Sequence, residues 1–228
     1  MIGVVDSGMG GENTVREIRR MQPHLNILLL KDTKNAPYGT KSVSELVKIT
    51  EENIERLVSF GAESVLLACC TASTVWERLG KWHKEHSFPI LRAVADEAGN
   101  VTECGCAALL ATERTVASGA FKRLLPGMKI LDIPAQKLVM FVERGERDRF
   151  VTRECLAYLE ETLRALSGEG ADTLILGCTH FPSLVGTISD IAEKYGVKYT
   201  VSSSLAGART LLQKKELLKC ESGVTVRI

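Results

Sequence analysis

Short apolar runs alternate along this chain with segments in which apolar residues recur every three or four positions. Eight runs rich in Val, Ile and Leu have the length of β-strands, and most of them contain no alternating polar residues. Continuous apolar runs of this kind are typical of parallel strands covered on both faces. The predicted strands are Ile2–Val5, Ile27–Lys31, Ser64–Cys69, Ile90–Val94, Ala107–Thr112, Lys129–Ile133, Thr173–Gly177 and Lys198–Val201.

Helical spacing fills the segments between these runs. Ser42 and Glu45 fit a capping box at the start of one helix. Four leucines farther along step by three and four positions and so share one face of another helix: Leu156, Leu159, Leu163 and Leu166. Strands that alternate with helices in this way predict an α/β fold with largely parallel sheets.

The two halves of the chain resemble one another. The first predicted strand ends at Asp6 and a matching strand ends at Thr112, 106 positions later, while Cys69 and Cys178 lie 109 positions apart at the ends of two further strands. We therefore predict a duplication: two similar, pseudo-symmetric α/β domains that face one another, with the active site in the cleft between them.

Domain boundaries follow from this duplication. The ends of a chain often lie close together, so we expect the last helix, roughly residues 204–218, to return to the first domain. The predicted first domain is residues 1–95 with about 206–228, and the predicted second domain is residues 96–205.

Composition and charge exclude several classes of protein. Of the 228 residues, 45% are hydrophobic and 25% are charged, as in an ordinary globular protein. The formal charge is +1 and the basic residues form no long run, so we expect no nucleic-acid partner and no anionic membrane surface. No apolar stretch in the sequence reaches the ~18 residues that a membrane span needs.

The seven cysteines are an odd number, and the first residues begin a strand pattern and not a signal peptide. These features favour reduced thiols in a cytoplasmic protein over a disulfide framework. Cys104 and Cys106 are close in sequence without a second pair, and adjacent Cys69 and Cys70 are poorly placed for a tetrahedral metal. We therefore predict no metal site, and a thiol redox role for Cys69 and Cys70 is an alternative.

Polar and reactive residues gather where the predicted strands end. Asp6, Asp32, Cys69, Thr112 and Cys178 all fall at or just after the carboxyl end of a strand. Parallel α/β sheets bind their ligands at this edge. We therefore expect these five residues to surround one small-molecule site.

Cys69 and Cys178 occupy equivalent places in the two halves, each between a strand and the start of a helix. Unpaired N–H groups at a helix N-terminus favour the thiolate, so we expect this position to lower the pKa of both thiols. His180 follows Cys178 by two residues and could exchange a proton with it, and Asp6 is expected beside Cys69. The plainer alternatives are that these cysteines are core residues and that the imidazole caps a helix.

Two loops add backbone and hydroxyl groups to the same edge. The spacing of the glycines in Ser7–Gly11 matches neither a dinucleotide fingerprint nor a P-loop, so we predict close backbone approach to a small ligand or its carboxylate. Pro37 and Gly39 fix a turn that presents Tyr38. Five hydroxyls near this edge either bind the ligand or cap helices: Thr71, Ser73, Thr112, Thr115 and Thr179.

Together these segments resemble the glutamate racemase family, within the aspartate/glutamate racemase superfamily. The matching segments run along nearly the whole chain: Ile2–Gly11, Asp32 with Pro37–Ser42, Ala68–Ser73, Ala111–Thr115 and Leu176–Pro182. Each is short, but their order and spacing are specific. Two departures stand out: Cys70 replaces an Asn that helps to bind substrate in the family, and the Glu-Asn-Thr of residues 12–14 replaces an apolar Leu-Thr-Val stretch.

The resemblance implies a racemase that needs no cofactor and acts on glutamate with two thiols. Cys69 and Cys178 would face the α-carbon from opposite sides. Asp6 would assist Cys69, and His180 would assist Cys178. The implied substrate-binding residues are Ser7, Tyr38, Gly39, Cys70, Thr71, Thr112, Thr115 and Thr179, backed by Asp32 and Glu143. The product, D-glutamate, is used to build bacterial peptidoglycan.

Neighbouring interpretations stay open. The same fold could racemise aspartate or another small acidic substrate, or it could bind a small ligand without catalysis. No cofactor motif is present to act as an electron sink, so a weakly acidic carbon would need preorganised donors around the developing carbanion. We expect a small-molecule substrate and a bacterial, cytoplasmic location, and we leave a homodimer open.

Overall fold

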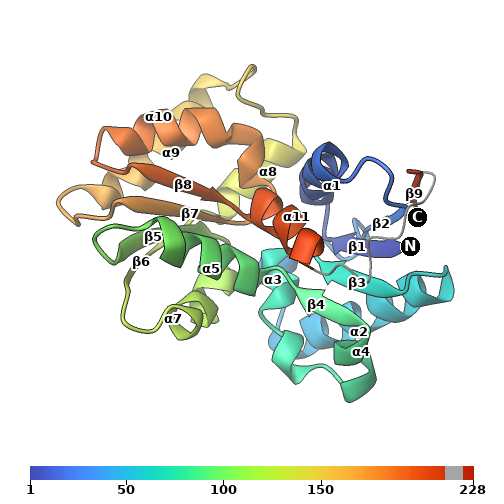
Figure 1. The fold of residues 1–228 in the computed structure, drawn as a ribbon. Coiled ribbons are helices and arrows are strands. Elements are labelled where there is room, and N and C mark those ends of the chain that lie inside the picture. The colour runs from blue at the N-terminus through green and yellow to red at the C-terminus, as the bar shows by residue number, and fades with distance from the viewer. Residues whose placement is uncertain (214–222) are drawn as a thin grey trace.

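Two parallel sheets form the centres of two facing lobes in this computed structural model, which describes residues 1–213 and 223–228 (Figure 1). The first sheet has the order β4-β3-β1-β2-β9, with β1 (Ile2–Asp6), β2 (Ile27–Lys31), β3 (Ser64–Leu67), β4 (Ser87–Pro89) and β9 (Thr225–Arg227). The second has the order β6-β5-β7-β8, with β5 (Cys106–Ala111), β6 (Lys129–Pro134), β7 (Thr173–Gly177) and β8 (Tyr199–Ser202).

The two sheets repeat one arrangement of strands. β1 lies between β2 and β3, and β5 lies between β6 and β7, with every neighbouring pair parallel. β4 and β8 then occupy matching outer places beside β3 and β7. The predicted fold class, two similar α/β domains with parallel sheets, is confirmed.

Helices cover both sheets and fill the space between them. The α-helices are α1 (Gly10–Met21), α2 (Val43–Ser59), α3 (Cys70–Ser73), α4 (Lys81–Glu85), α5 (Leu91–Val101), α6 (Glu113–Ala117), α7 (Ala120–Leu124), α8 (Gln136–Glu143), α9 (Arg153–Leu163), α10 (Val185–Glu193) and α11 (Ser203–Gln213). The 3₁₀ turns are η1 (Tyr38–Thr40), η2 (Trp76–Arg78), η3 (Arg164–Leu166) and η4 (Phe181–Leu184). Figure 1 shows α11 in the centre of the molecule, between the lobes.

Local sequence signals account for the ends and faces of several helices. The capping box at the start of α2 is present: Ser42 Oγ accepts from the Glu45 N–H, and the Glu45 carboxylate accepts from the Ser42 N–H. In the predicted leucine stripe, Leu159 and Leu163 of α9 are fully buried, whereas Leu156 is 39% exposed. The stripe is therefore narrower than its spacing predicts.

The strand predicted at Ile90–Val94 is wrong. The strand is β4, which ends at Pro89, and the following residues form α5. The buried residues Leu91, Val94, Ala95 and Ala98 follow helical spacing, which the short apolar run concealed. Pro89 ends β4 at the edge of its sheet, where its missing N–H needs no strand partner.

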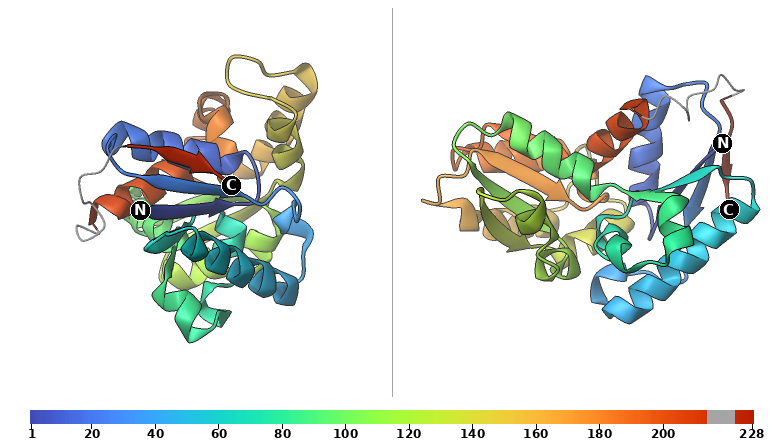
Figure 2. Two further views of the ribbon diagram at one scale, coloured as in Figure 1. Left: turned by 90° about the vertical axis from the view of Figure 1, so that its right-hand side faces the viewer. Right: turned by 60° about the horizontal axis from the view of Figure 1, so that its bottom comes forward.

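The C-terminal segment returns to the first lobe. Helix α11 packs against α1 and α5, and β9 pairs in parallel with β2, which brings both termini to the same side of the molecule (Figure 2). The sequence did not predict β9, which has only three residues. Residues 214–218 of the predicted last helix lie outside the described residues.

One apolar cluster joins the facing sides of the two sheets. It contains Leu29 and Leu66 from the first sheet, Leu109 and Ile175 from the second, and Val94 from α5 between them. Two further clusters fill the outer sides of the lobes. The lobes are therefore packed against one another through a shared apolar core.

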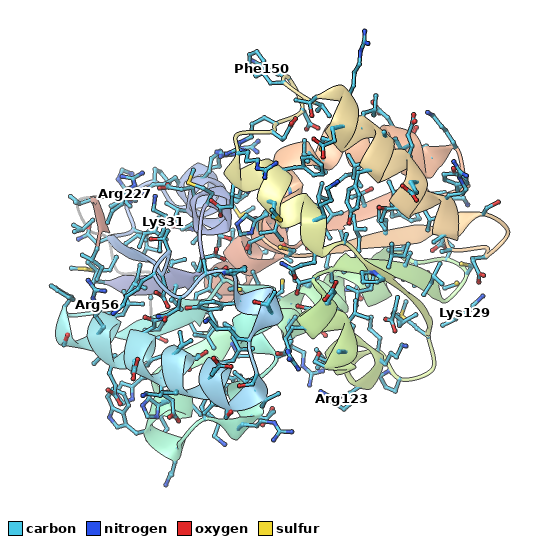
Figure 3. All side chains as sticks on the ribbon, turned by 180° about the vertical axis from the view of Figure 1, so that it is seen from behind. Lys31, Arg56, Arg123, Lys129, Phe150 and Arg227 are labelled. Carbon is cyan, nitrogen blue, oxygen red and sulfur yellow. The ribbon has the colours of Figure 1, made fainter. Side chains whose placement is uncertain are left out.

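The basic residues labelled in Figure 3 are not gathered on one lobe. Lys31, Arg56 and Arg227 lie on the first lobe, and Arg123 and Lys129 lie on the second. In the part of the chain that the structure describes, no helix is both long enough and apolar enough to span a membrane.

A buried carboxylate ties the start of the second sheet to the end of α5. Asp172 accepts hydrogen bonds from the Thr102 hydroxyl at 2.8 Å, the Glu103 N–H at 2.7 Å, the Cys104 N–H at 2.9 Å and the Thr173 hydroxyl at 2.8 Å. Although burial raises it, these hydrogen bonds together hold the pKa of the Asp172 carboxyl well below its usual range.

We expect Asp172→Asn to lower the free energy of unfolding by about 2 kcal/mol at pH 7. Because the pKa is lower in the folded state, the carboxylate stabilises the fold above the unfolded pKa of about 4, and this contribution is lost as the pH falls through the folded pKa. The difference between wild type and variant should therefore shrink as the pH is lowered below about 4. Urea titrations over this range test it, with exposed Asp190→Asn as the control. A difference that stays constant with pH would contradict the role given to the carboxylate.

Candidate active site

A cavity of about 470 Å³ lies at the carboxyl ends of the two sheets. Residues from both lobes form its wall, including both of the cysteines that the sequence singled out. The predicted site residues on this wall are Ser7, Tyr38, Gly39, Cys69, Thr71, Thr112, Glu143, Cys178 and His180. The structure therefore brings one thiol from each half of the chain to a single site.

Cys69 follows β3 and caps the four-residue helix α3. Its side chain is buried, and the Ser7 hydroxyl lies 3.7 Å from the sulfur. Burial, together with the nearby charge of Asp6, raises the pKa of the Cys69 thiol to about 11, although the N–H groups of α3 act to lower it. The expected lowering of this pKa is therefore wrong, because one helical turn cannot offset the loss of water.

Cys178 follows β7 in the equivalent place. Its sulfur lies 3.6 Å from Nδ1 of His180, and the other ring nitrogen, Nε2, lies 2.5 Å from the Glu143 carboxylate. Burial raises the pKa of the Cys178 thiol well above its usual value, and the charges of Cys69 and Asp6 raise it further. The hydrogen bond from His180 is the main cause that lowers the pKa of the Glu143 carboxyl. A thiol, an imidazole and a carboxylate thus form a chain along which a proton can move.

Each lobe donates a hydrogen bond to a carboxylate of the other lobe. Asp6 is fully buried in the first lobe, where the Gly8 N–H donates to it at 3.0 Å, and it also accepts from the Thr179 hydroxyl of the second lobe at 2.7 Å. Glu143 of the second lobe accepts in turn from the Met9 N–H of the first at 2.9 Å. Burial raises the pKa of the Asp6 carboxyl. The groups beside the two thiols are thus positioned across the boundary between the lobes.

Helix α1 also holds the turn that carries Cys178. The Asn13 amide donates to the Thr179 carbonyl oxygen at 2.8 Å and to the Ser183 hydroxyl at 3.0 Å. Asn13 therefore supplies a polar contact between the lobes at the edge of the site.

Three threonine hydroxyls meet where the lobes join. Thr71 lies 2.9 Å from Thr112 and 3.2 Å from Thr115, and the last two lie 2.9 Å apart. Thr112 also caps α6 by accepting from the Thr115 N–H. The capping role is therefore confirmed for Thr112, which also lines the cavity.

A second polar network fixes the turn at Tyr38 and Gly39. The Tyr38 hydroxyl donates to Asp32 at 2.6 Å, and the Asn53 amide of α2 donates to both side chains. Although burial raises it, hydrogen bonds from Tyr38, Asn35 and Asn53 hold the pKa of the Asp32 carboxyl below its usual value. Asp32 thus lies behind the wall and orients a residue that is on it. The sequence carried no signal for Asn53, which sits inside a long helix.

Three of the residues predicted to contact substrate lie behind the wall of this cavity. Thr115 and Thr179 are fully buried and act through the hydrogen bonds described above. Cys70 packs in the core cluster shared by the lobes, beside the Ser203 hydroxyl, and burial raises the pKa of its thiol well above its usual value. A thiol suits such a place because free cysteine packs as a small apolar side chain.

The structure adds residues to the wall that were not among the predicted site residues. They are Thr33, Ala36, Pro37, Gln136, Val139, Met140 and Arg144. Four of them belong to α8 or follow it directly, in a segment whose amphipathic pattern gives no sign of which face meets the cavity.

Among the described residues, the cysteines outside this site form no second cluster. Cys104 is exposed, and Cys106 is buried at the first residue of β5, at the opposite end of that strand from the cavity. Within residues 1–213 and 223–228, no group of three or more His, Cys, Asp or Glu side chains could hold a metal ion. Cys220 lies outside the described residues.

The raised pKa of Cys69 predicts slow alkylation. With a pKa of about 11, only about one thiol in 1,000 is ionised at pH 8, so its reaction with iodoacetamide should rise about tenfold per pH unit between pH 8 and pH 10. We expect exposed Cys104 to react at least ten times faster at pH 8 (an order-of-magnitude estimate). Peptide mass spectrometry after timed alkylation measures both rates. A rate for Cys69 that is independent of pH in this range would show that its thiolate already predominates.

The fold and cavity define a two-lobed α/β protein that presents one thiol from each lobe to a small-molecule site. The model of the Asp/Glu/hydantoin racemase family matches residues 12–209. The chain belongs to this family, and the resemblance seen in its sequence is confirmed.

Individual relatives agree with this assignment. The glutamate racemase of Herpetosiphon aurantiacus is 35% identical over 196 residues, which cover 84% of this chain and 76% of the relative. The crystal structure of a glutamate racemase isoform from Bacillus anthracis is 28% identical and has a TM-score of 0.87, covering 100% of this chain and 86% of that one. The structure of Escherichia coli glutamate racemase in complex with L-glutamate and the activator UDP-MurNAc-Ala is 28% identical, with a TM-score of 0.77, and covers 97% and 83% of the two chains.

Proposed function

We propose that this protein racemises glutamate, converting the L- to the D-enantiomer without a cofactor. The observation that carries the proposal is the pair of buried thiols, Cys69 and Cys178, which come from opposite lobes to one cavity. A planar carbanion at Cα can gain a proton from either side, so racemisation needs an acid or base on each face. The relatives that bear the name glutamate racemase support the choice of substrate.

In the proposed reaction, one cysteine sulfur gains a proton from the substrate and the other cysteine sulfur gives a proton to it. The thiolate of one cysteine removes the α-proton from its side, and the thiol of the other donates a proton to the opposite face. Asp6 assists Cys69, and His180 with Glu143 assists Cys178. Burial and the negative charge of Asp6 raise the pKa of both thiols. We infer that the positive charge of the substrate ammonium group offsets the charge of Asp6 and allows one thiolate to form.

Substrate binding is proposed for the polar groups on the wall. Ser7, Tyr38, Gly39, Thr71 and Thr112 would hold the carboxylates and the ammonium group through hydroxyl and backbone N–H groups. Three residues would support them from behind: Cys70, Thr115 and Thr179.

We further propose a setting for this activity. The D-glutamate would be used for peptidoglycan in the cytoplasm of a bacterium, and a homodimer stays a prediction. The proposed domains are those of the sequence analysis, residues 1–95 with about 206–228 and residues 96–205. The parallel pairing of β9 with β2 supports the return of the C-terminus to the first domain.

Incubation with L-glutamate in heavy water tests the proposal. Optical rotation should fall to zero while the α-proton is replaced by deuterium, and D-glutamate should give the same end point. L-aspartate and L-glutamine in parallel samples test the substrate. Faster loss of rotation with aspartate would change the substrate, and binding of glutamate with no exchange would make the protein a ligand-binding member of the family.

A further inference from the structure

Helix α8 forms one wall of the cavity with a single face. Gln136, Val139, Met140, Glu143 and Arg144 all line the cavity, and the last of them caps the helix. Their spacing of three, one, three and one positions places them on the same side of the helix. The chemistry of this wall is thus set by one short stretch of sequence.

The charges near the thiols are negative. Asp6 is buried close enough to raise the pKa of both cysteines. Glu143 lies on the wall itself, and His180 is within 2.5 Å of it, so a protonated imidazole would be neutralised by that carboxylate. A substrate with two carboxylates and one ammonium group has a net negative charge, and these groups repel it unless a cation faces the entrance.

Arg144 is the one lysine or arginine among the described residues that line the cavity. Its side chain is exposed, and within residues 1–213 and 223–228 it makes no hydrogen bond or ion pair. Arg147, three residues later, instead donates to the carbonyl oxygens of Val142 and Glu146. The C-terminal end of a helix favours a cation in any case, but that preference does not require a side chain on the cavity wall without a partner.

We infer that Arg144 is a substrate-recognition residue, which attracts the dicarboxylate at the mouth of the cavity and pairs with its second carboxylate. The inference rests on the proposed function, which supplies the identity of the ligand. The residue faces no reacting atom in this assignment, so it acts on binding and leaves the proton transfers to the thiols. A charge at the rim of a site mainly changes association and its dependence on salt.

Calorimetry with L-glutamate tests this inference at about 20 mM and about 300 mM NaCl, because added salt screens exposed charges. At low salt we expect Arg144→Gln to raise the Kd about five- to tenfold, and to raise KM similarly while kcat stays within about twofold. The difference should shrink at high salt, and Arg144→Lys should keep most of the affinity and of the salt dependence. Arg149→Gln is the matched control, because Arg149 is exposed on the same loop but does not line the cavity.

Two outcomes would overturn the inference. One is an unchanged Kd in Arg144→Gln at low salt. The other is a loss of kcat at constant KM, which would place Arg144 among the groups that act on the reacting atoms. A wild-type protein that binds glutamate without turnover would contradict the proposed function instead, and the same binding comparison would still decide the role of Arg144. A wild-type protein that does not bind glutamate would overturn both.

Discussion

Replacing either Cys69 or Cys178 by serine should lower racemisation of glutamate at least about 1,000-fold. General acid–base groups typically contribute about 10²–10⁴-fold to a reaction rate, and a serine hydroxyl is a far weaker acid than the thiol it replaces. The remaining thiol can still remove and return a proton on its own face. We therefore expect each variant to exchange the α-proton of only one enantiomer in heavy water, and the two variants to act on opposite enantiomers.

Cys104→Ser is the control for these variants, because Cys104 is exposed and distant from the cavity wall. It should racemise like the wild type. Proton exchange is followed by NMR and racemisation by circular dichroism in the same samples. If both active-site variants kept the wild-type rate, the two thiols would have no part in the reaction, whatever the substrate.

Gly10→Ala should damage the site and the fold together. Gly10 is the first residue of α1, and an added methyl group would lie 2.7 Å from the Thr179 Cβ and 2.9 Å from its carbonyl carbon, inside van der Waals contact. Because part of this contact is backbone, rotation of a side chain cannot relieve it. Overpacking of this kind typically costs about 1–3 kcal/mol of unfolding free energy. The turn that carries Cys178 would shift, and a displacement near 1 Å can lower a rate about 100-fold.

Gly99→Ala is the matched control for this change. Gly99 lies inside α5, where the nearest atom to an added methyl group is the Leu125 Cδ2 at 3.4 Å. Alanine is favoured over glycine in a helix by about 1 kcal/mol, so this variant should be at least as stable as the wild type and equally active. Thermal unfolding and the glutamate assay measure both effects. A fully active and stable Gly10→Ala protein would show that α1 and the Thr179 turn are not held at a fixed distance.

Much of the fold could be predicted from the sequence, because strands covered on both faces are continuously apolar. The same rule failed at Ile90, where a short apolar run belongs to a helix and only the more distant Ala95 and Ala98 reveal its period. It also missed β9, whose three residues are partly exposed and are a strand only because β2 offers an edge.

The candidate site could likewise be predicted only in part from the sequence. Residues at strand ends could be predicted, since topology brings such ends together, and Cys69 and Cys178 lie on one cavity wall as a result. The pKa of the thiols could not be predicted, because it depends on how deeply each thiol is buried in the apolar cluster of its own lobe and on the charge of Asp6 nearby. The same holds for Arg144, whose place on the wall depends on how α8 docks and not on its own sequence pattern.

The exchange of supports between the lobes bears on how such a protein could arise. A lobe on its own would hold Asp6 without the Thr179 hydroxyl, or Glu143 without the Met9 N–H, and so each carboxylate would lose one of its hydrogen bonds. If a gene fusion created the two matching halves, the ancestral single-lobe chain would have needed a second copy of itself to complete the reaction centre. Fusion would then have made permanent an encounter that had depended on protein concentration.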